Sequence, residues 1–188
     1  MYATVEGPLD AAVVRRIFSD EQRELLRVDA LGGRSVVEAR IPKLREAARR
    51  VGWFVLVDLD NDNCAPELRA DWGIEADDPL NFRVAIREIE SWILADRDRL
   101  AKYMSVSRDR IPTDPDALGD PKATLISIAR HSRKREIREG LVPRPGSGRS
   151  QGPLYTNLLS RFVTTEWRPA VARMASPSLD RCLATFVA

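Results

Sequence analysis

The chain has 188 residues, 44% of them hydrophobic, and a formal net charge of +2, which suits one domain with a core of its own. It contains no run of the ~18 apolar residues that a membrane span needs, and its N-terminus lacks the basic segment and long apolar run of a signal peptide. Two cysteines and one histidine exclude a disulfide framework and a multi-histidine zinc site, and they indicate a reducing, cytoplasmic environment.

The first half of the chain alternates apolar runs with helical periodicity. The run at 53–57 is apolar without alternation, as in a strand covered on both faces. We therefore predict the α/β class, with a mainly parallel sheet flanked by helices. The expected elements are strands at 2–5, 24–30, 53–57 and 81–86, and helices from Leu9, at 36–50 and at 88–100.

After about residue 105 the pattern changes to helices without strands. Turn residues and proline dominate 107–121, and the Gly, Pro and Ser residues of 141–153 predict a flexible loop. Helices are expected at 122–130, 153–166 and 178–186. We interpret Trp53, Trp92 and Cys64 as buried residues, Trp167 as a hydrophobic anchor, and His131 as a surface or structural residue.

Charge divides the chain into two parts. Residues 1–105 carry 16 Lys and Arg against 20 Asp and Glu, whereas residues 106–188 carry 14 against 8. An acidic part joined to a basic part indicates a metal site beside an anion-binding surface, although ordinary charge fluctuation gives the same counts. We expect an α/β domain at 1–105 and a basic helical C-terminal extension at 106–188, packed on it.

Carboxylates follow the predicted strands at their carboxyl ends, where open α/β sheets bind ligands. They are Glu6 after the first strand, Asp10 one helical turn further, Asp58 and Asp60 after the third, and Glu88 and Glu90 after the fourth. Clustered carboxylates repel one another unless a cation neutralises them. Oxygen ligands suit Mg²⁺ or Mn²⁺, which catalyse phosphoryl transfer. The alternative is that these acids are only solvated loop residues, and for Asp62 we prefer it.

Other motifs that contain spaced aspartates fit less well. An EF-hand counted from Asp58 would need Gly in place of Asn63 and Glu in place of Arg69. A haloacid-dehalogenase phosphatase would need Thr in place of Asp62, on the first strand. The segment "GSGRSQG" lacks the lysine of a P-loop and follows no strand.

Two motifs in order resemble a Toprim domain, the α/β metal-binding module of topoisomerases, bacterial primases and several nucleases. "EGPLD" at 6–10 matches its first motif, and "VLVDLDND" at 55–62 matches its Asp-x-Asp motif. "REIESWILAD" at 87–96 resembles an element of small RloB-like Toprim proteins. The overcoming-lysogenization-defect nucleases are another group with a Toprim domain. This last match favours Glu90 over Glu88 as the third acid.

The resemblance implies a divalent-metal-dependent nuclease that hydrolyses phosphodiesters of DNA or RNA, in a phage-defence or mobile-element setting. It allows an ATPase partner and a homo-oligomer. The implied catalytic residues are Glu6, Asp58, Asp60 and Glu90, and the implied ligands of Mg²⁺ or Mn²⁺ are these four with Asp10 and Glu88. Two alternatives stay open: a non-catalytic binding or regulatory subunit, and a small-nucleotide phosphohydrolase or nucleotidyl transferase.

A basic stretch is the candidate nucleic-acid-binding surface. Between 130 and 149, seven Lys and Arg stand against two Glu, which suits a phosphate backbone but also an ordinary solvated helix face. Lys122, at an expected helix N-terminus, is a further candidate phosphate contact, with a plain surface lysine as the alternative. The predicted contact residues are Lys122, Arg130, Arg133, Lys134, Arg135, Arg138 and Arg149.

Overall fold

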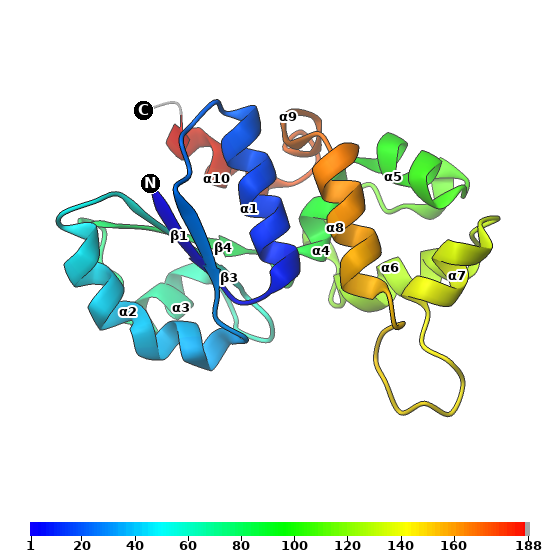
Figure 1. Cartoon of the computed structure of the whole chain (residues 1–188), viewed down its shortest axis with the longest axis horizontal. Coiled ribbons are helices and arrows are strands. Elements are labelled where there is room, and N and C mark those ends of the chain that lie inside the picture. Colours follow the sequence, from blue (N-terminus) through cyan, green and yellow to red (C-terminus); the bar gives the residue numbers. More distant parts are fainter. Residues whose placement is uncertain (187–188) are drawn as a thin grey trace.

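A computed structural model describes residues 1–186 and confirms the α/β class. Four parallel strands form one sheet in the order β2-β1-β3-β4, and Figure 1 shows the helices around it. The strands are β1 (Tyr2–Val5), β2 (Arg27–Ala30), β3 (Trp53–Asp58) and β4 (Leu80–Ala85). The helices that cover the sheet are α1 (Pro8–Asp20), α2 (Arg34–Ala48), α3 (Ala65–Asp71) and α10 (Pro177–Leu183).

The apolar run of β3 supplies both faces of the sheet. Phe54 and Leu56 belong to the core under α1 and α10, whereas Val55 and Val57 belong to a second core under α2 and α3. This division follows from the alternation of side chains along a strand. The absence of polar residues in 53–57 therefore indicated a central strand between two helical layers.

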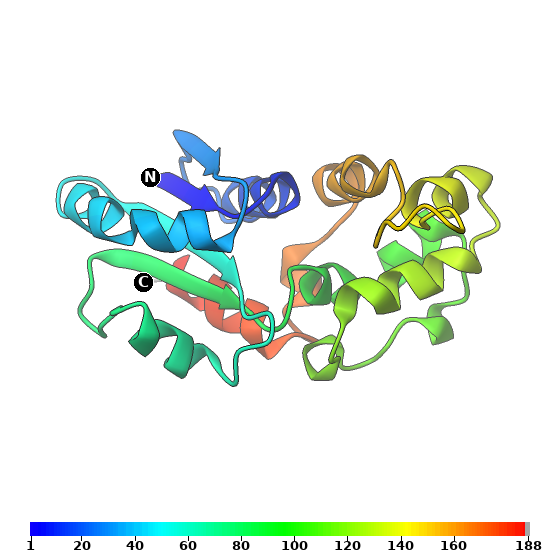
Figure 2. The same cartoon turned by 90° about the horizontal axis from the view of Figure 1, so that it is seen from below.

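A helical region stands beside the sheet with its flanking helices (Figure 2). It consists of α4 (Glu90–Ala95), α5 (Arg97–Met104), α6 (Pro121–Arg130), α7 (Arg135–Leu141), α8 (Tyr155–Thr165) and α9 (Pro169–Ala172). The chain then returns to the sheet through α10, and the Phe186 ring packs edge-on against Phe18, with centroids 4.9 Å apart. One continuous core thus joins residues on both sides of position 105.

The single helix expected at 88–100 is wrong, because it is divided at Asp96. The Asp96 side chain is fully buried and caps α5 by accepting a hydrogen bond from the Arg99 N–H. Its carboxylate also accepts from the Arg168 guanidinium, at 2.6 Å and 3.0 Å. The helical spacing of apolar residues continues across this position, which is why periodicity alone missed the division.

Two glycines close the base of the irregular loop at 142–151, which projects from the helical region in Figure 1. The Gly152 N–H donates to the Leu141 carbonyl at 2.9 Å, and the Leu154 N–H donates to the Gly140 carbonyl at 3.0 Å. A Cβ on Gly152 would overlap the Gly140 carbonyl, and a Cβ on Gly140 would overlap the Leu158 side chain. We call this pair of backbone hydrogen bonds, between Gly140–Leu141 and Gly152–Leu154, the glycine clasp.

The aromatic and cysteine predictions had mixed outcomes. Trp92 and Trp167 are fully buried, and the Trp167 Nε1–H donates to the Trp92 carbonyl, which confirms the anchor. Trp53 and Cys64 are only partly buried, so the prediction of burial was wrong for both. Trp53 is the first residue of β3, at the end of the strand away from Asp58, and it stacks on Tyr2. Cys64 precedes α3 and lines a pocket.

Within residues 1–186, no helix combines the length and the apolar character required to cross a membrane.

Candidate metal and catalytic site

Carboxylates from three chain segments converge at one edge of the sheet. The strands are parallel, so their carboxyl ends share this edge, and Asp58, Asp10 and Glu90 line one pocket of about 170 Å³. Asp58 ends β3, Asp10 lies in the first turn of α1, and Glu90 begins α4. Lys122 and Tyr155 line the same pocket. The strand-end pattern of the sequence therefore corresponds to a real cluster, which we call the acid pocket.

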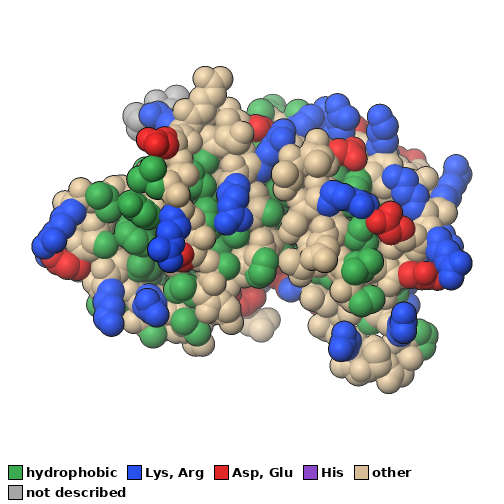
Figure 3. Space-filling view, viewed as in Figure 1, with side chains coloured by type: hydrophobic (Ala, Val, Ile, Leu, Met, Phe, Trp, Pro, Cys, Tyr) green, Lys and Arg blue, Asp and Glu red, His purple; other side chains and the backbone are tan. Residues whose placement is uncertain are grey.

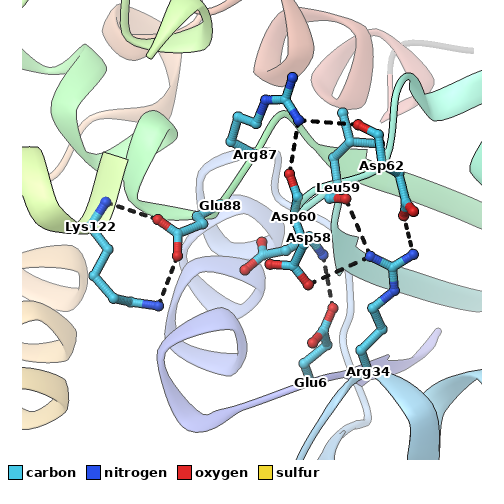
Figure 4. A network of polar contacts seen from close by, with 9 residues as sticks. All are labelled: Glu6, Arg34, Asp58, Leu59, Asp60, Asp62, Arg87, Glu88 and Lys122. Carbon is cyan, nitrogen blue, oxygen red and sulfur yellow. Dashed lines mark hydrogen bonds and ion pairs between the residues drawn. The ribbon is translucent and has the colours of Figure 1, made fainter. Parts of the chain in front are cut away.

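Glu6 adjoins this pocket from β1 and is tied to β3. Its Oε1 accepts a hydrogen bond from the Asp58 N–H at 2.9 Å, as Figure 4 shows. Burial is the largest influence on this carboxyl, and the charges of Asp10 and Asp60 add to it, so its pKa rises to about 7. The Asp58 N–H and the Arg34 guanidinium oppose this rise. Glu6 can therefore gain or lose a proton near neutral pH.

Asp58 is the most congested carboxylate of the cluster. Burial raises its pKa well above the usual range, and the charges of Asp10, Glu90 and Glu6 raise it further. Its Oδ1 is buried and has no hydrogen-bond partner within residues 1–186. Asp10 is also buried, which raises its pKa, but its Oδ2 accepts from the Gly7 N–H at 2.8 Å. Asp58 is thus the acid whose ionised form a bound cation would stabilise most.

Glu90 is only 2% exposed, and its two oxygens differ. Oε1 accepts a hydrogen bond from the Tyr155 hydroxyl at 2.9 Å and lies 3.7 Å from the Lys122 Nζ. Oε2 is buried and has no partner in the described chain. Burial raises the pKa of Glu90 to about 6, although the charge of Lys122 opposes this. Tyr155 thus fixes the orientation of Glu90 and leaves one oxygen available.

Glu88 and Lys122 form a separate pair beside the pocket (Figure 4). The Lys122 Nζ is 3.0 Å from Glu88 Oε1, and the Lys122 N–H donates to Glu88 Oε2 at 2.8 Å. Both Glu88 oxygens are therefore engaged at the N-terminus of α6, where a carboxylate is favoured. Lys122 lies among the acids and apart from the basic stretch. As a ligand Glu88 is therefore less available than Glu90, the order that the resemblance implied.

Asp60 and Asp62 face an arginine on α2. Arg34 Nη1 lies 3.5 Å from Asp60 Oδ2, and Arg34 Nη2 pairs with Asp62. Arg87 Nη1 donates to the carbonyls of both aspartates, at 3.0 Å and 3.1 Å. The Asp60 side chain is 42% exposed, so it lies at the rim and not in the acid pocket. The structure therefore separates Asp58 from Asp60, which the Asp-x-Asp motif treats alike.

The segment that carries Asp60 has an unusual backbone. Asp60 and Arg87 both have φ in the left-handed region, at 50° and 59°, and the Asp60 N–H donates to the Arg87 carbonyl at 2.7 Å. Such conformations cost of order 1–3 kcal/mol for residues other than glycine. Their contacts with each other hold the two strand ends together at the rim of the site.

Three residues of this region were not predicted from the sequence, namely Arg34, Tyr155 and Gln151. Arg34 follows β2, so the strand-end rule that found the acids would also have found it. Tyr155 lies 65 positions from Glu90, and no spacing rule connects them. Gln151 lines the acid pocket from the base of the projecting loop.

The donor set fits a hard divalent cation. All candidate ligands are carboxylate oxygens, and Asp58 Oδ1 and Glu90 Oε2 are buried with no partner among residues 1–186. In that part of the chain, no three His, Cys, Asp or Glu side chains already surround one point as metal ligands. Binding would therefore draw the carboxylates closer together, with the cation replacing their mutual repulsion by attraction.

Among the predicted basic residues, Lys122 lines the acid pocket and the others do not. Figure 3 shows Lys and Arg side chains over the helical region and the projecting loop. Lys134 Nζ donates to the Tyr103 carbonyl, Arg138 donates to the Ser132 carbonyl, and Arg135 pairs with Glu139. Among the basic side chains of 130–149, those that are exposed and have no hydrogen bond or ion pair within residues 1–186 are Arg130, Arg133, Arg144 and Arg149.

The projecting loop connects the basic stretch to the acids. Arg144 and Arg149 line a cavity of about 420 Å³ together with Gln151, and Gln151 also lines the acid pocket. Comparison with protein-family models, with curated proteins and with solved structures found no match to this chain. Functional assignment therefore depends on the site itself.

Proposed function

We propose that the chain is a divalent-metal-dependent nuclease that hydrolyses phosphodiester bonds of DNA or RNA. The observation that supports this most is the acid pocket, where the carboxylates of Asp10, Asp58 and Glu90 meet beside Glu6. An arginine-bearing loop reaches the same pocket through Gln151. An acidic cluster next to exposed cations suits a substrate that is itself a polyanion and needs a metal for its chemistry.

Asp58 and Glu90 would hold Mg²⁺ or Mn²⁺ through their unpartnered oxygens, with Asp10 assisting. Such an ion polarises a phosphoryl group and increases the acidity of bound water. Tyr155 holds Glu90 in place, and Lys122 offsets part of the carboxylate charge. Glu6, whose pKa is about 7, would accept or deliver a proton beside the reacting phosphate.

The exposed arginines would position the substrate. Arg144 and Arg149 lie on the loop, and Arg130 and Arg133 lie near α7. Phosphates of one nucleic-acid strand could therefore contact these arginines while a neighbouring phosphate reaches the acid pocket. Asp60 at the rim, held by Arg34, would be a ligand only if its carboxylate leaves that arginine. The Toprim resemblance adds a phage-defence setting and an ATPase partner as proposals by analogy.

The test is degradation of single-stranded DNA, duplex DNA and RNA by purified protein with Mn²⁺, Mg²⁺ or EDTA. We expect metal-dependent cleavage that Asp58→Asn and Glu90→Gln abolish. The matched control is Glu67→Gln, which removes an exposed carboxylate on α3 and should retain full activity. Cleavage by Asp58→Asn at the wild-type rate would refute the mechanism. Hydrolysis of free nucleotides with intact polymers would favour the phosphohydrolase alternative, and metal binding without any hydrolysis would favour the regulatory one.

A further inference from the structure

A second and larger pocket lies at the carboxyl ends of β3 and β4, where Leu59, Ile86 and Arg87 line it. It has a volume of about 680 Å³, within the range of about 300–1,000 Å³ that is usual for small-molecule sites. Its walls come from the start of α3, the end of β4, the turn at 116–119 and α10. We call it the arginine pocket, because Arg69, Arg87 and Arg181 all line it.

Three chain segments pass from the arginine pocket to the acid pocket or to its side. Leu59 lines the arginine pocket and follows Asp58, Arg87 lines it and precedes Glu88, and Gly119 lines it and lies three positions before Lys122. No residue lines both pockets. The two are therefore adjacent but distinct, and a ligand that extends past the strand ends could occupy both.

The arginine pocket combines apolar walls with an excess of positive charge, because its described lining holds three arginines and Asp116. Its apolar walls include Pro66, Ile86 and Leu118. Arg69 and Arg87 donate only to backbone carbonyls, and the Arg181 side chain has no hydrogen bond or ion pair in residues 1–186.

Asp116, the one Asp or Glu among the described residues that line the pocket, is already engaged. Asp116 accepts hydrogen bonds from the Ser176 hydroxyl and from the Ser178 N–H, both at 2.8 Å. The pocket therefore favours a ligand with an apolar body and an anionic group.

We propose that the arginine pocket binds the nucleotide next to the scissile phosphodiester, with its base against the apolar wall and its phosphate at Arg87 and Arg181. This inference rests on the proposed nuclease function and names where a flanking nucleotide is held. A phosphate at Arg181 would gain a charge-assisted contact to a guanidinium that the fold leaves without a partner. Substrate recognition would then include a single nucleotide unit as well as the backbone.

The chain provides its own reporter for this pocket. Cys64 lines it and is partly exposed, whereas Cys182 is buried and its pKa is raised by burial to about 12. A thiol reagent should therefore label Cys64 alone in the folded protein. We expect adenosine 5′-monophosphate to slow this labelling saturably, and adenosine and ribose 5-phosphate to protect more weakly. The measurement needs neither metal nor cleavage.

Two variants make the test specific. Arg181→Ala should weaken protection about tenfold, the effect of losing one charge-assisted hydrogen bond. Gly119→Trp should abolish protection by filling the pocket, because a Cβ at Gly119 would meet no atom within 4 Å and its φ is not in the left-handed region. Arg40→Ala, which removes an exposed arginine of α2 that has no side-chain hydrogen bond or ion pair within residues 1–186, should leave protection unchanged. Circular dichroism checks that each variant folds.

The outcomes separate this inference from the proposed function. No saturable protection of the wild type, or equal protection of the wild type and Arg181→Ala, would overturn the assignment of the pocket. Nuclease activity without protection would leave the acid pocket as proposed and reject the arginine pocket. Protection by the nucleotide without any hydrolysis would support the arginine pocket as a nucleotide site and reject the proposed nuclease.

Discussion

Replacing Glu90 by glutamine should stabilise the metal-free protein, although it removes a residue of the proposed active site. The carboxylate is buried, and its pKa rises from 4.5 to about 6. Stability from its protonated form is therefore fully present below about pH 4.5 and is lost as pH rises through about 6. Glutamine resembles that protonated form at every pH and can still accept the hydrogen bond from Tyr155.

The size of the effect follows from the same shift. About 1.5 pKa units at about 1.4 kcal/mol each give about 2 kcal/mol of extra stability for Glu90→Gln near pH 8. For a chain of this size, that corresponds to roughly 4–8 °C in Tm. The gain should vanish near pH 4, where the wild-type carboxyl is protonated in both folded and unfolded states.

The assay is thermal unfolding in EDTA at several pH values, repeated with Mg²⁺. With metal the order should reverse, because the wild type gains binding energy that the variant lacks. Glu67→Gln, on the exposed surface of α3, should show neither effect. If the Glu90→Gln protein is less stable than the wild type near pH 8 in EDTA, burial does not destabilise the ionised Glu90 carboxylate. That result would refute the idea that buried carboxylates in the pocket lower the stability of the metal-free fold.

Further expectations concern the clasp, the loop and the buried ion pair. Gly152→Ala should destabilise the fold by about 3 kcal/mol in urea unfolding, because its Cβ would overlap the Gly140 carbonyl. Replacing Arg144 and Arg149 together by alanine should weaken binding to duplex DNA and make the slope of log affinity against log salt concentration less steep by about 1.8. An unchanged slope would show that the loop does not contact phosphates. Asp96→Ala should cost about 3 kcal/mol in the same unfolding assay, because it leaves a guanidinium partner unpaired and removes a helix cap.

The parallel sheet was predictable because its signal is local. A continuous apolar run at 53–57 requires cover on both faces, and a strand-end rule then places Glu6 and Asp58 at one edge. The same local signals did not predict features that tertiary contacts determine. The periodicity of 88–100 does not reveal the cap at Asp96, and α7 was not among the expected helices, because its charges were considered mainly as a phosphate-binding surface.

The chemistry within the site was less predictable than its location. Asp58 and Asp60 are equivalent in the motif, yet one is buried among carboxylates and the other faces Arg34 at the rim. That difference depends on α2, which contributes nothing to the motif. Likewise, the hydrogen bond from Tyr155 to Glu90 joins segments whose proximity is set by helix packing and not by spacing along the chain.

The glycine clasp allows the projecting loop to vary without changing the rest of the fold. Since residues 140–141 and 152–154 are bonded to each other, the segment between them can change in length without moving the helices on either side. Closing a loop of twice the length costs only about 0.6 kcal/mol more. If the loop contacts substrate as proposed, changes of length or charge at its tip would alter substrate binding and leave the acids in place. The loop is therefore a suitable position for engineered insertions or a grafted binding segment.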